Sequence, residues 1–231
     1  MATEENIMKL PLSNRLRKCA EFVRPGAFVA DVGCDHGYLS LHLLTQGIAS
    51  NVYASDVNEG PLQSAVINAA KFGVNDKIKF YLSDGVRNVP RDFDTLICAG
   101  MGADTMISIL EAAPWLKNEG YTLILQCQSK RPELRRYLHD QGYGILREDL
   151  AQDGKFIYTV MEVRFGGPAA EKELDYYISP ALLRCGSPLL PAFLSRVTEG
   201  IRTAVRGMEL SSSEELPRFR GLLQSLEELV K

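Results

Sequence analysis

Short apolar runs alternate with longer stretches of helical periodicity along the first two thirds of the chain. The runs of strand length lie at residues 28–32, 51–55, 77–82, 94–98 and 121–127. The stretches of helical spacing lie at 13–23, 38–46, 61–72, from the AGMG segment to about residue 113, and at 132–141. Strands that are separated by helices form parallel sheets with both faces covered, so this pattern predicts an α/β domain.

The pattern changes at residue 143, where two strand-like segments follow each other directly. Residues 143–150 and 155–164 are joined by AQDG, which is too short for a crossover helix. Successive strands with so short a connection pair antiparallel, because a parallel return needs about a dozen residues or more. We therefore predict a Rossmann-like sheet of seven strands that ends in an antiparallel hairpin.

Beyond Gly166-Gly167-Pro168 the strand pattern stops, and apolar residues fall at helical spacing over 190–208 and again over 216–229. This spacing predicts a helical, coiled-coil-like appendage in which the last two helices form an antiparallel hairpin. Helices that simply dock on the main domain fit the pattern equally well. The predicted division is a domain over residues 1–166 and a helical C-terminal domain over residues 167–231.

Composition adds limits to this picture. The chain of 231 residues is 45% hydrophobic and 24% charged, and its formal charge of −3 gives no global basic field. The five cysteines form no CxxC pair, which favours reduced thiols, and Cys34 with His36 lacks the second pair of ligands that a metal needs. The N-terminus shows no apolar signal core and no segment reaches about 18 apolar residues, so we expect a cytoplasmic protein without a membrane span.

The segment FVADVGCDHGY, residues 28–38, carries the most specific chemistry. A strand that enters a helix through glycines leaves backbone N–H groups free at the helix N-terminus, where the polar groups of a ligand can approach. Asp56 follows at the end of the next apolar run, where an acid can accept hydrogen bonds from both hydroxyls of a ribose. Together these features predict a nucleoside cofactor.

Asp35 stands in the middle of this turn, where many nucleotide-binding turns have glycine. An aspartate tolerates unusual backbone angles better than most residues. Its negative charge suits an ammonium or sulfonium group and suits a pyrophosphate badly, which disfavours a dinucleotide. The predicted hairpin also disfavours a nicotinamide oxidoreductase, whose sheet would supply another helix there. Asp35 can alternatively cap the following helix, and both roles are compatible.

The motifs that carry a family resemblance are LSNRLRKCAEFV, ADVGCDHGYLSLHL, ASDVNEGPLQSA, SDG, ICAGMGADTM and LILQCQ. In this order and spacing, over about residues 9–165, the chain resembles the bacterial tRNA adenine-22 N1-methyltransferase family, TrmK. The resemblance implies a class I methyltransferase that uses S-adenosylmethionine, and a sheet ending in a hairpin is typical of that class. The helical tail resembles the family's coiled-coil part in architecture only.

The resemblance also implies the site residues. Those expected to bind the cofactor are Arg15, Asp31, Gly33, Cys34, Asp35, Gly37, Asp56, Val57, Asp84, Gly85, Ala99 and Gly100. On the acceptor side we expect Asp35, His36 and Met101. The Asn-Pro-Pro-Tyr-like motif of many amino-group methyltransferases is absent after the fourth strand. Adenine N1 already exposes a lone pair at neutral pH, so methyl transfer to it needs alignment rather than a base.

Two basic segments are candidates for contact with tRNA phosphates: the N-terminal helix within residues 9–24, and the cations Lys130, Arg131, Arg135 and Arg136. The alternative for both is a solvated helix face. Two other functions stay open at this point. One is methylation of another RNA, a protein or a small molecule. The other is a partner protein that binds the cofactor and RNA without turnover.

Overall fold

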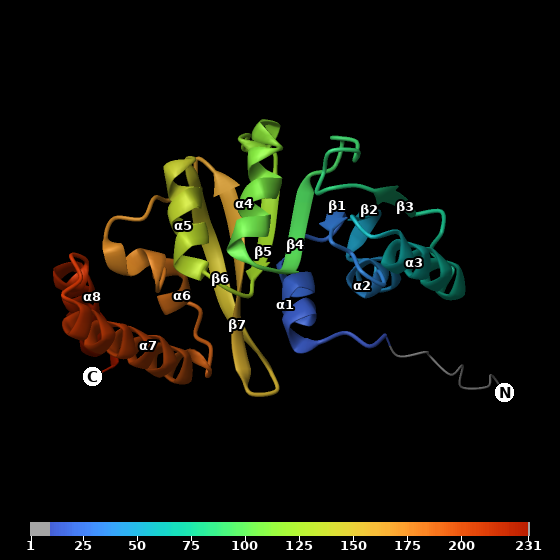
Figure 1. Ribbon diagram of the computed structural model, residues 1–231. Coiled ribbons are helices and arrows are strands. Elements are labelled where there is room, and N and C mark those ends of the chain that lie inside the picture. Colours follow the sequence, from blue (N-terminus) through green and yellow to red (C-terminus); the bar gives the residue numbers. More distant parts are fainter. Residues whose placement is uncertain (1–9, 231) are drawn as a thin grey trace.

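The computed structural model describes residues 10–230 and contains a seven-stranded sheet with helices on both faces (Figure 1). Residues 1–9 lie outside the described residues. They include Lys9 and most of the N-terminal segment in which the sequence shows no signal core. The strand order is β3-β2-β1-β4-β5-β7-β6. The strands are β1 Ala27–Val32, β2 Ala49–Asp56, β3 Ile78–Leu82, β4 Thr95–Met101, β5 Thr122–Cys127, β6 Tyr143–Asp153 and β7 Phe156–Phe165.

The first five strands pair in parallel, and β7 pairs antiparallel with both β5 and β6. The predicted Rossmann-like sheet that ends in an antiparallel hairpin is therefore confirmed. No helix among residues 10–230 is long and apolar enough to cross a membrane.

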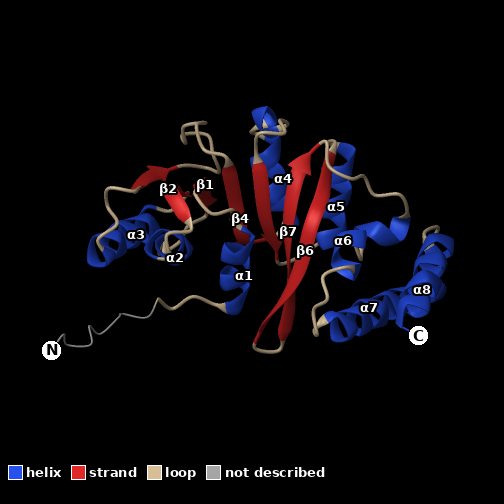
Figure 2. Cartoon of the chain, turned by 180° about the vertical axis from the view of Figure 1, so that it is seen from behind, coloured by secondary structure: helices blue, strands red, loops and turns tan. Residues whose placement is uncertain are grey.

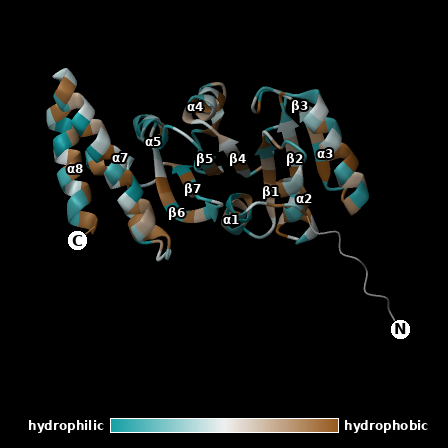
Figure 3. Ribbon diagram, turned by 60° about the horizontal axis from the view of Figure 1, so that its bottom comes forward, coloured by the Kyte–Doolittle hydropathy of each residue, from teal (hydrophilic) through white to brown (hydrophobic). Residues whose placement is uncertain are grey.

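Each face of the sheet has its own apolar core. Helices α1 Asn14–Phe22, α2 Tyr38–Thr45 and α3 Glu59–Phe72 cover one face, and α4 Ala103–Glu111 and α5 Arg131–Asp140 cover the other (Figure 3). In β1, Val29 packs with the first group and Ala30 with the second. Successive side chains of a strand point to opposite faces, so a strand covered on both sides reads as an unbroken apolar run.

The tip of the β6–β7 hairpin lies beside the first helix (Figure 2). Asp153 accepts the backbone N–H of Asn14 at 2.9 Å and that of Arg15 at 3.1 Å. A carboxylate at this position satisfies free N–H groups and is favoured by the helix dipole. The residue that precedes the helix, Ser13, makes no side-chain capping bond. The hairpin therefore supplies the cap of α1 and fixes where that helix begins.

Four helical segments follow the sheet: η2 Glu173–Tyr176, α6 Pro180–Leu183, α7 Leu190–Ser211 and α8 Leu216–Val230. The last two form the predicted helical hairpin. They share an apolar core that also includes Leu150 of β6 and Ile157 of β7, so the pair is docked on the sheet edge as well. The last two helices therefore pack on each other as a hairpin and also dock on the main domain, so both sequence interpretations apply. The two short segments have four residues each, too few to show a helical period in the sequence.

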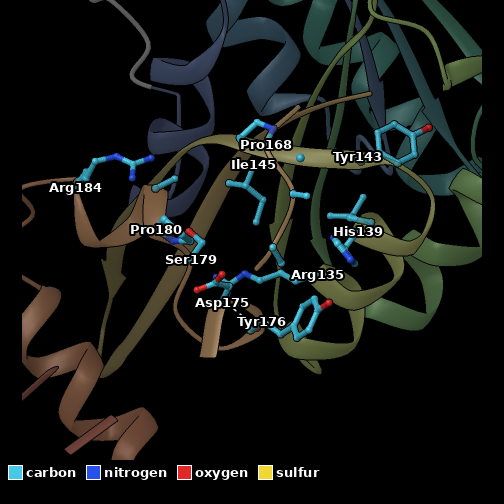
Figure 4. Close-up of a pocket in the computed structure, with 15 residues that line it drawn as sticks. Arg135, His139, Tyr143, Ile145, Pro168, Asp175, Tyr176, Ser179, Pro180 and Arg184 are labelled. Atoms are coloured by element: carbon cyan, nitrogen blue, oxygen red, sulfur yellow. Dashed lines mark hydrogen bonds between the residues drawn. The ribbon is translucent and has the colours of Figure 1, made fainter. Parts of the chain in front are cut away.

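A buried charged network holds the tail on α5 and β6, and Figure 4 shows three of its residues, Arg135, Tyr176 and Ser179. Arg135 forms an ion pair with Glu148 and donates to the carbonyl oxygens of Tyr176 at 3.1 Å and Tyr177 at 2.6 Å. Ser179 donates to the same glutamate and accepts the N–H of Leu182 as the cap of α6. Each charge thus has hydrogen-bonding partners in a place that water does not reach.

Replacing Glu148 by alanine should lower the free energy of unfolding by about 3–5 kcal/mol, because Arg135 would stay buried without its counter-charge. Urea unfolding followed by circular dichroism measures this loss. The matched control is Glu199→Ala, which removes the exposed ion pair with Arg202 and should cost about 1 kcal/mol or less. A Glu148→Ala loss no larger than that of the control would contradict this account of the junction.

Candidate functional site

A cavity of about 290 Å³ opens where β1 and β4 end and α2 begins. Its walls come from the start of α1, the β1–α2 turn and the end of β4. The residues that line it are Arg15, Leu16, Asp31, Gly33, Cys34, Asp35, His36, Tyr38, Leu39, Ala99 and Gly100. Ligands of open α/β sheets bind at this place, beyond the carboxyl ends of neighbouring strands. Eight of the predicted site residues are thus brought together: Arg15, Asp31, Gly33, Cys34, Asp35, His36, Ala99 and Gly100.

Hydrogen bonds to the second strand fix the β1–α2 turn. The carbonyl oxygen of Ser55 accepts the N–H groups of Gly33 at 2.8 Å and Cys34 at 2.9 Å. The carboxylate of Asp56 accepts the N–H of Asp35 at 3.0 Å. Asp35 has a φ of +52°, a left-handed conformation of the unusual kind that aspartate tolerates. The turn is therefore held rigidly while its side chains face the cavity.

The side chains of Asp35 and His36 are open to solvent at the cavity. Asp35 is 69% exposed, and its carboxylate lies 3.6 Å from Nε2 of His36. Gly37 is the N-cap residue of α2, and no side chain caps that position. The alternative role of Asp35 as the helix cap is therefore wrong, and its charge is free to face a ligand.

Asp31 is buried beneath the turn. The hydroxyl of Ser40 donates to its carboxylate at 2.6 Å. The pKa of Asp31 is raised to about 6, chiefly by burial and to a smaller extent by the nearby Asp56, while the interaction with Ser40 opposes the shift. Burial and these carboxylates also raise the pKa of the Cys34 thiol, so Cys34 stays protonated and is not a nucleophile.

Met101 reaches from β4 across to the turn. A Cβ built on Gly33 would lie 2.2 Å from its Cε. The fourth strand was expected to end at Cys98, but it continues through Met101, with an irregular register between Ala99 and Met101. Gly100 has a φ of +82° and allows this irregularity. The loop expected after Cys98 is therefore mostly strand, and the extension carries the methionine to the cavity edge.

Gln126 of β5 is a residue that the sequence analysis did not select. Its Oε1 accepts from Arg15 at 3.1 Å and from the N–H of Gly100 at 3.0 Å. Its Nε2 is buried and has no partner among the residues that the structure describes. The sequence feature that could have indicated Gln126 is its position as a polar residue inside the apolar run TLILQC. Gln126 therefore ties the α1 wall of the cavity to the β4 wall.

Four predicted site residues lie outside the cavity lining, at the ends of β2 and β3. Asp56 is buried, and its second oxygen accepts the N–H of Asn58 at 2.9 Å. Val57 is exposed. Asp84 is exposed and lies 3.5 Å from Arg87, and the Gly85 carbonyl accepts from Ser55. Gly37, also predicted, ends the turn and packs against α3.

The cations of the 130–136 segment serve mainly to dock the tail. Arg135 is buried in the network described above, so its predicted contact with tRNA phosphates is wrong. Arg136 pairs with Glu173 at 2.9 Å and lies over the ring of Tyr176. Arg131 lies over a phenylalanine ring of α7. Lys130 is the exposed member and pairs with Asp104 of α4 at 2.7 Å.

Comparison with known proteins shows that this chain is similar to methyltransferases. Residues 12–161 match the family described as methyltransferase domain. The tRNA (adenine(22)-N(1))-methyltransferase of Bacillus subtilis is 31% identical over 159 residues, which make up 68% of this chain and 67% of that protein. Among the residues described here, no group of three or more His, Cys, Asp or Glu side chains is arranged to hold a metal ion.

Two solved structures are similar in fold to this chain over nearly its whole length. A Streptococcus pneumoniae protein in complex with S-adenosyl-L-methionine has a TM-score of 0.82 at 29% identity, with 95% of this chain and 100% of that chain covered. The M1A22 tRNA methyltransferase TrmK of B. subtilis has a TM-score of 0.85 at 24% identity, over 96% of this chain and 100% of that one. The latter shows that the fold, tail included, is shared.

The buried Asp31 should make stability depend on pH. Its pKa is raised in the folded state, so it stabilises the protein while protonated, and this contribution is lost as the pH rises through about 6. Asp31→Asn, which keeps an acceptor for Ser40, should therefore gain roughly 1 kcal/mol relative to the wild type between pH 5 and pH 7. Urea unfolding of both proteins at the two pH values measures the difference. A pH-independent difference would contradict the raised pKa.

Proposed function

The chain belongs to the tRNA (adenine-22 N1)-methyltransferase family, and from this premise we propose that it transfers the methyl group of S-adenosylmethionine to N1 of adenine 22 in tRNA. The observation that carries the proposal is the rigid β1–α2 turn with the exposed carboxylate of Asp35 facing the cavity. An acid at this place favours a cationic ligand such as a sulfonium compound. We also propose the cytoplasm as its location, since free cysteines persist there.

The cavity residues fit S-adenosylmethionine. Asp31 and Asp35 provide negative charge for its ammonium and sulfonium groups, and Arg15 provides positive charge for its carboxylate. The ribose and adenine roles predicted for Asp56, Val57, Asp84 and Gly85 stay predictions.

S-adenosylmethionine, when bound, supplies an electrophilic methyl group. The residues of this chain position the acceptor and stabilise the charge that develops on it. Adenine N1 carries a lone pair in the plane of the ring at neutral pH, so the protein needs no general base. Methylation leaves the base positively charged, and the carboxylate of Asp35, with His36 beside it, stabilises that charge.

The acceptor reaches the cavity along the end of β4. Ala99 has a small side chain and Gly100 has none, which leaves room for a base taken out of its stack, and Met101 lies at the edge of that space. For the tRNA body we propose contact with Lys130 and with the cations of the N-terminal helix. Arg135 has no part in this contact because it is buried.

The direct test is incubation with S-adenosylmethionine and an unmodified tRNA that has adenine at position 22, followed by mass spectrometry of the nucleosides. We expect N1-methyladenosine, and we expect none when adenine 22 is replaced by guanine. Formation of N1-methyladenosine in both tRNAs would contradict the target position. A wild type that binds cofactor and tRNA but gives no methylated nucleoside would contradict the activity.

Gly33→Ala should weaken binding of S-adenosylhomocysteine by about 10-fold or more, measured by isothermal titration calorimetry. The new methyl group would displace the end of Met101 at the cavity, in addition to straining a backbone with a φ of +71°. Gly47→Ala is the matched control, because Gly47 has a φ of +64° but open space around its Cβ position. Equal affinity in the two variants would show that the space at Gly33 does not matter.

A further inference from the structure

A second groove, of about 380 Å³, lies where three parts of the chain meet. One wall is the segment after β5, with Gln128, Lys130 and Arg131. The second is the start of β7, with Phe156, and the third is α7, with Arg196. The described residues thus combine three cations and two aromatic rings, those of Phe156 and Tyr158, in one groove outside the cofactor cavity.

Phe156 is unusual in being exposed. The residue is 53% exposed, and it is the one aromatic residue among the large exposed apolar residues of 10–230. The next residue, Ile157, is buried in the core of the tail, and strand geometry points the two side chains in opposite directions. Nζ of Lys155 lies 5.4 Å from the ring centroid. The Lys155 ammonium lies over the ring and the Tyr158 ring packs beside it at a centroid distance of 6.2 Å, and the rest of the ring surface is open to a ligand.

The backbone around Phe156 is clamped on two sides. Arg196 donates to the carbonyl oxygen of Lys155 at 2.7 Å, which ties the hairpin tip to α7. Asp153 caps α1 on the other side of the same tip. The backbone that carries the ring is therefore fixed between α1 and α7, which reduces the conformational freedom that is lost when a flat ligand stacks on the ring.

The groove borders the cofactor cavity. The N–H of Gln128 donates to the carbonyl oxygen of Met101 at 2.8 Å, and Met101 reaches Gly33 in the cavity. A Cβ on Gly100, which lines the cavity, would lie 3.7 Å from Nε2 of Gln128. An acceptor that enters the cavity past β4 therefore has its neighbouring groups next to this groove.

We propose that the groove binds a nucleotide adjacent to the target adenine, with its base stacked on Phe156 and its phosphate contacted by Lys130 and Arg196. An aromatic platform beside a cationic wall is the combination that binds unpaired nucleotides without reading their sequence. The pairing of Lys130 with Asp104 leaves the other ammonium donors of Lys130 for a phosphate. This inference rests on the proposed function, because it takes tRNA as the substrate.

The test measures the affinity for the unmodified tRNA by fluorescence anisotropy, with S-adenosylhomocysteine present and at several salt concentrations. Phe156→Ala should weaken binding about 5- to 100-fold, with an unchanged salt slope because no charge is lost. Phe156→Trp should keep the affinity, and Phe156→Leu should lose it, because leucine keeps apolar bulk without a stacking face. Lys130→Gln should reduce the salt slope by about 0.7–0.9. Ile67→Ala, an exposed apolar change on α3, is the control and should bind like the wild type.

The outcomes separate this inference from the proposed function. Calorimetry with S-adenosylhomocysteine first establishes that each variant is folded. If the wild type methylates adenine 22 but Phe156→Ala binds tRNA as tightly as the wild type, or Phe156→Leu binds like Phe156→Trp, stacking in the groove is overturned and the function stands. If the wild type forms no N1-methyladenosine while Phe156→Ala weakens tRNA binding, the function fails and the groove stands. A wild type that binds no tRNA overturns both.

Discussion

The β6–β7 hairpin is the constraint on which the other parts of the structure depend. Asp153 at its tip caps α1 and so places Arg15 at the cavity. Glu148, further along β6, neutralises the buried Arg135, and Leu150 and Ile157 join the core of the tail. One pair of antiparallel strands therefore sets the position of the first helix, the last helices and the edge of the site, although these segments lie far apart in the sequence.

Negative charge is concentrated beneath and around the cavity, and the fold stabilises it in different ways. Asp31 is held by Ser40, and Asp56 is held by backbone N–H groups of the turn and of Asn58. Asp35 is left in solvent. The buried acids are thereby used to fix the turn, and the exposed one faces the ligand. This arrangement of charge disfavours the binding of an anionic cofactor and favours the binding of a cationic one.

Features set by local sequence could be predicted, and those set by distant partners could not. The period of the apolar residues and the short AQDG segment were enough to predict the strands and the terminal hairpin, although residues 151–153 continue β6 and only Gly154 and Lys155 connect the two strands. The burial of Arg135 depends on Glu148 and on carbonyl groups about 40 residues away, which a basic helix pattern does not reveal. The cap that Asp153 gives to Asn14 spans 139 residues.

The use of cations inside the fold limits how the chain can hold RNA. With a formal charge of −3 and with Arg135, Arg136 and Arg131 engaged by the tail, few positive charges near the site stay free for phosphates. Counterion release grows with the number of phosphates neutralised, so few free cations give a small electrostatic contribution to binding. The proposed stacking of an unpaired base on Phe156 adds a contribution that does not depend on the number of free cations.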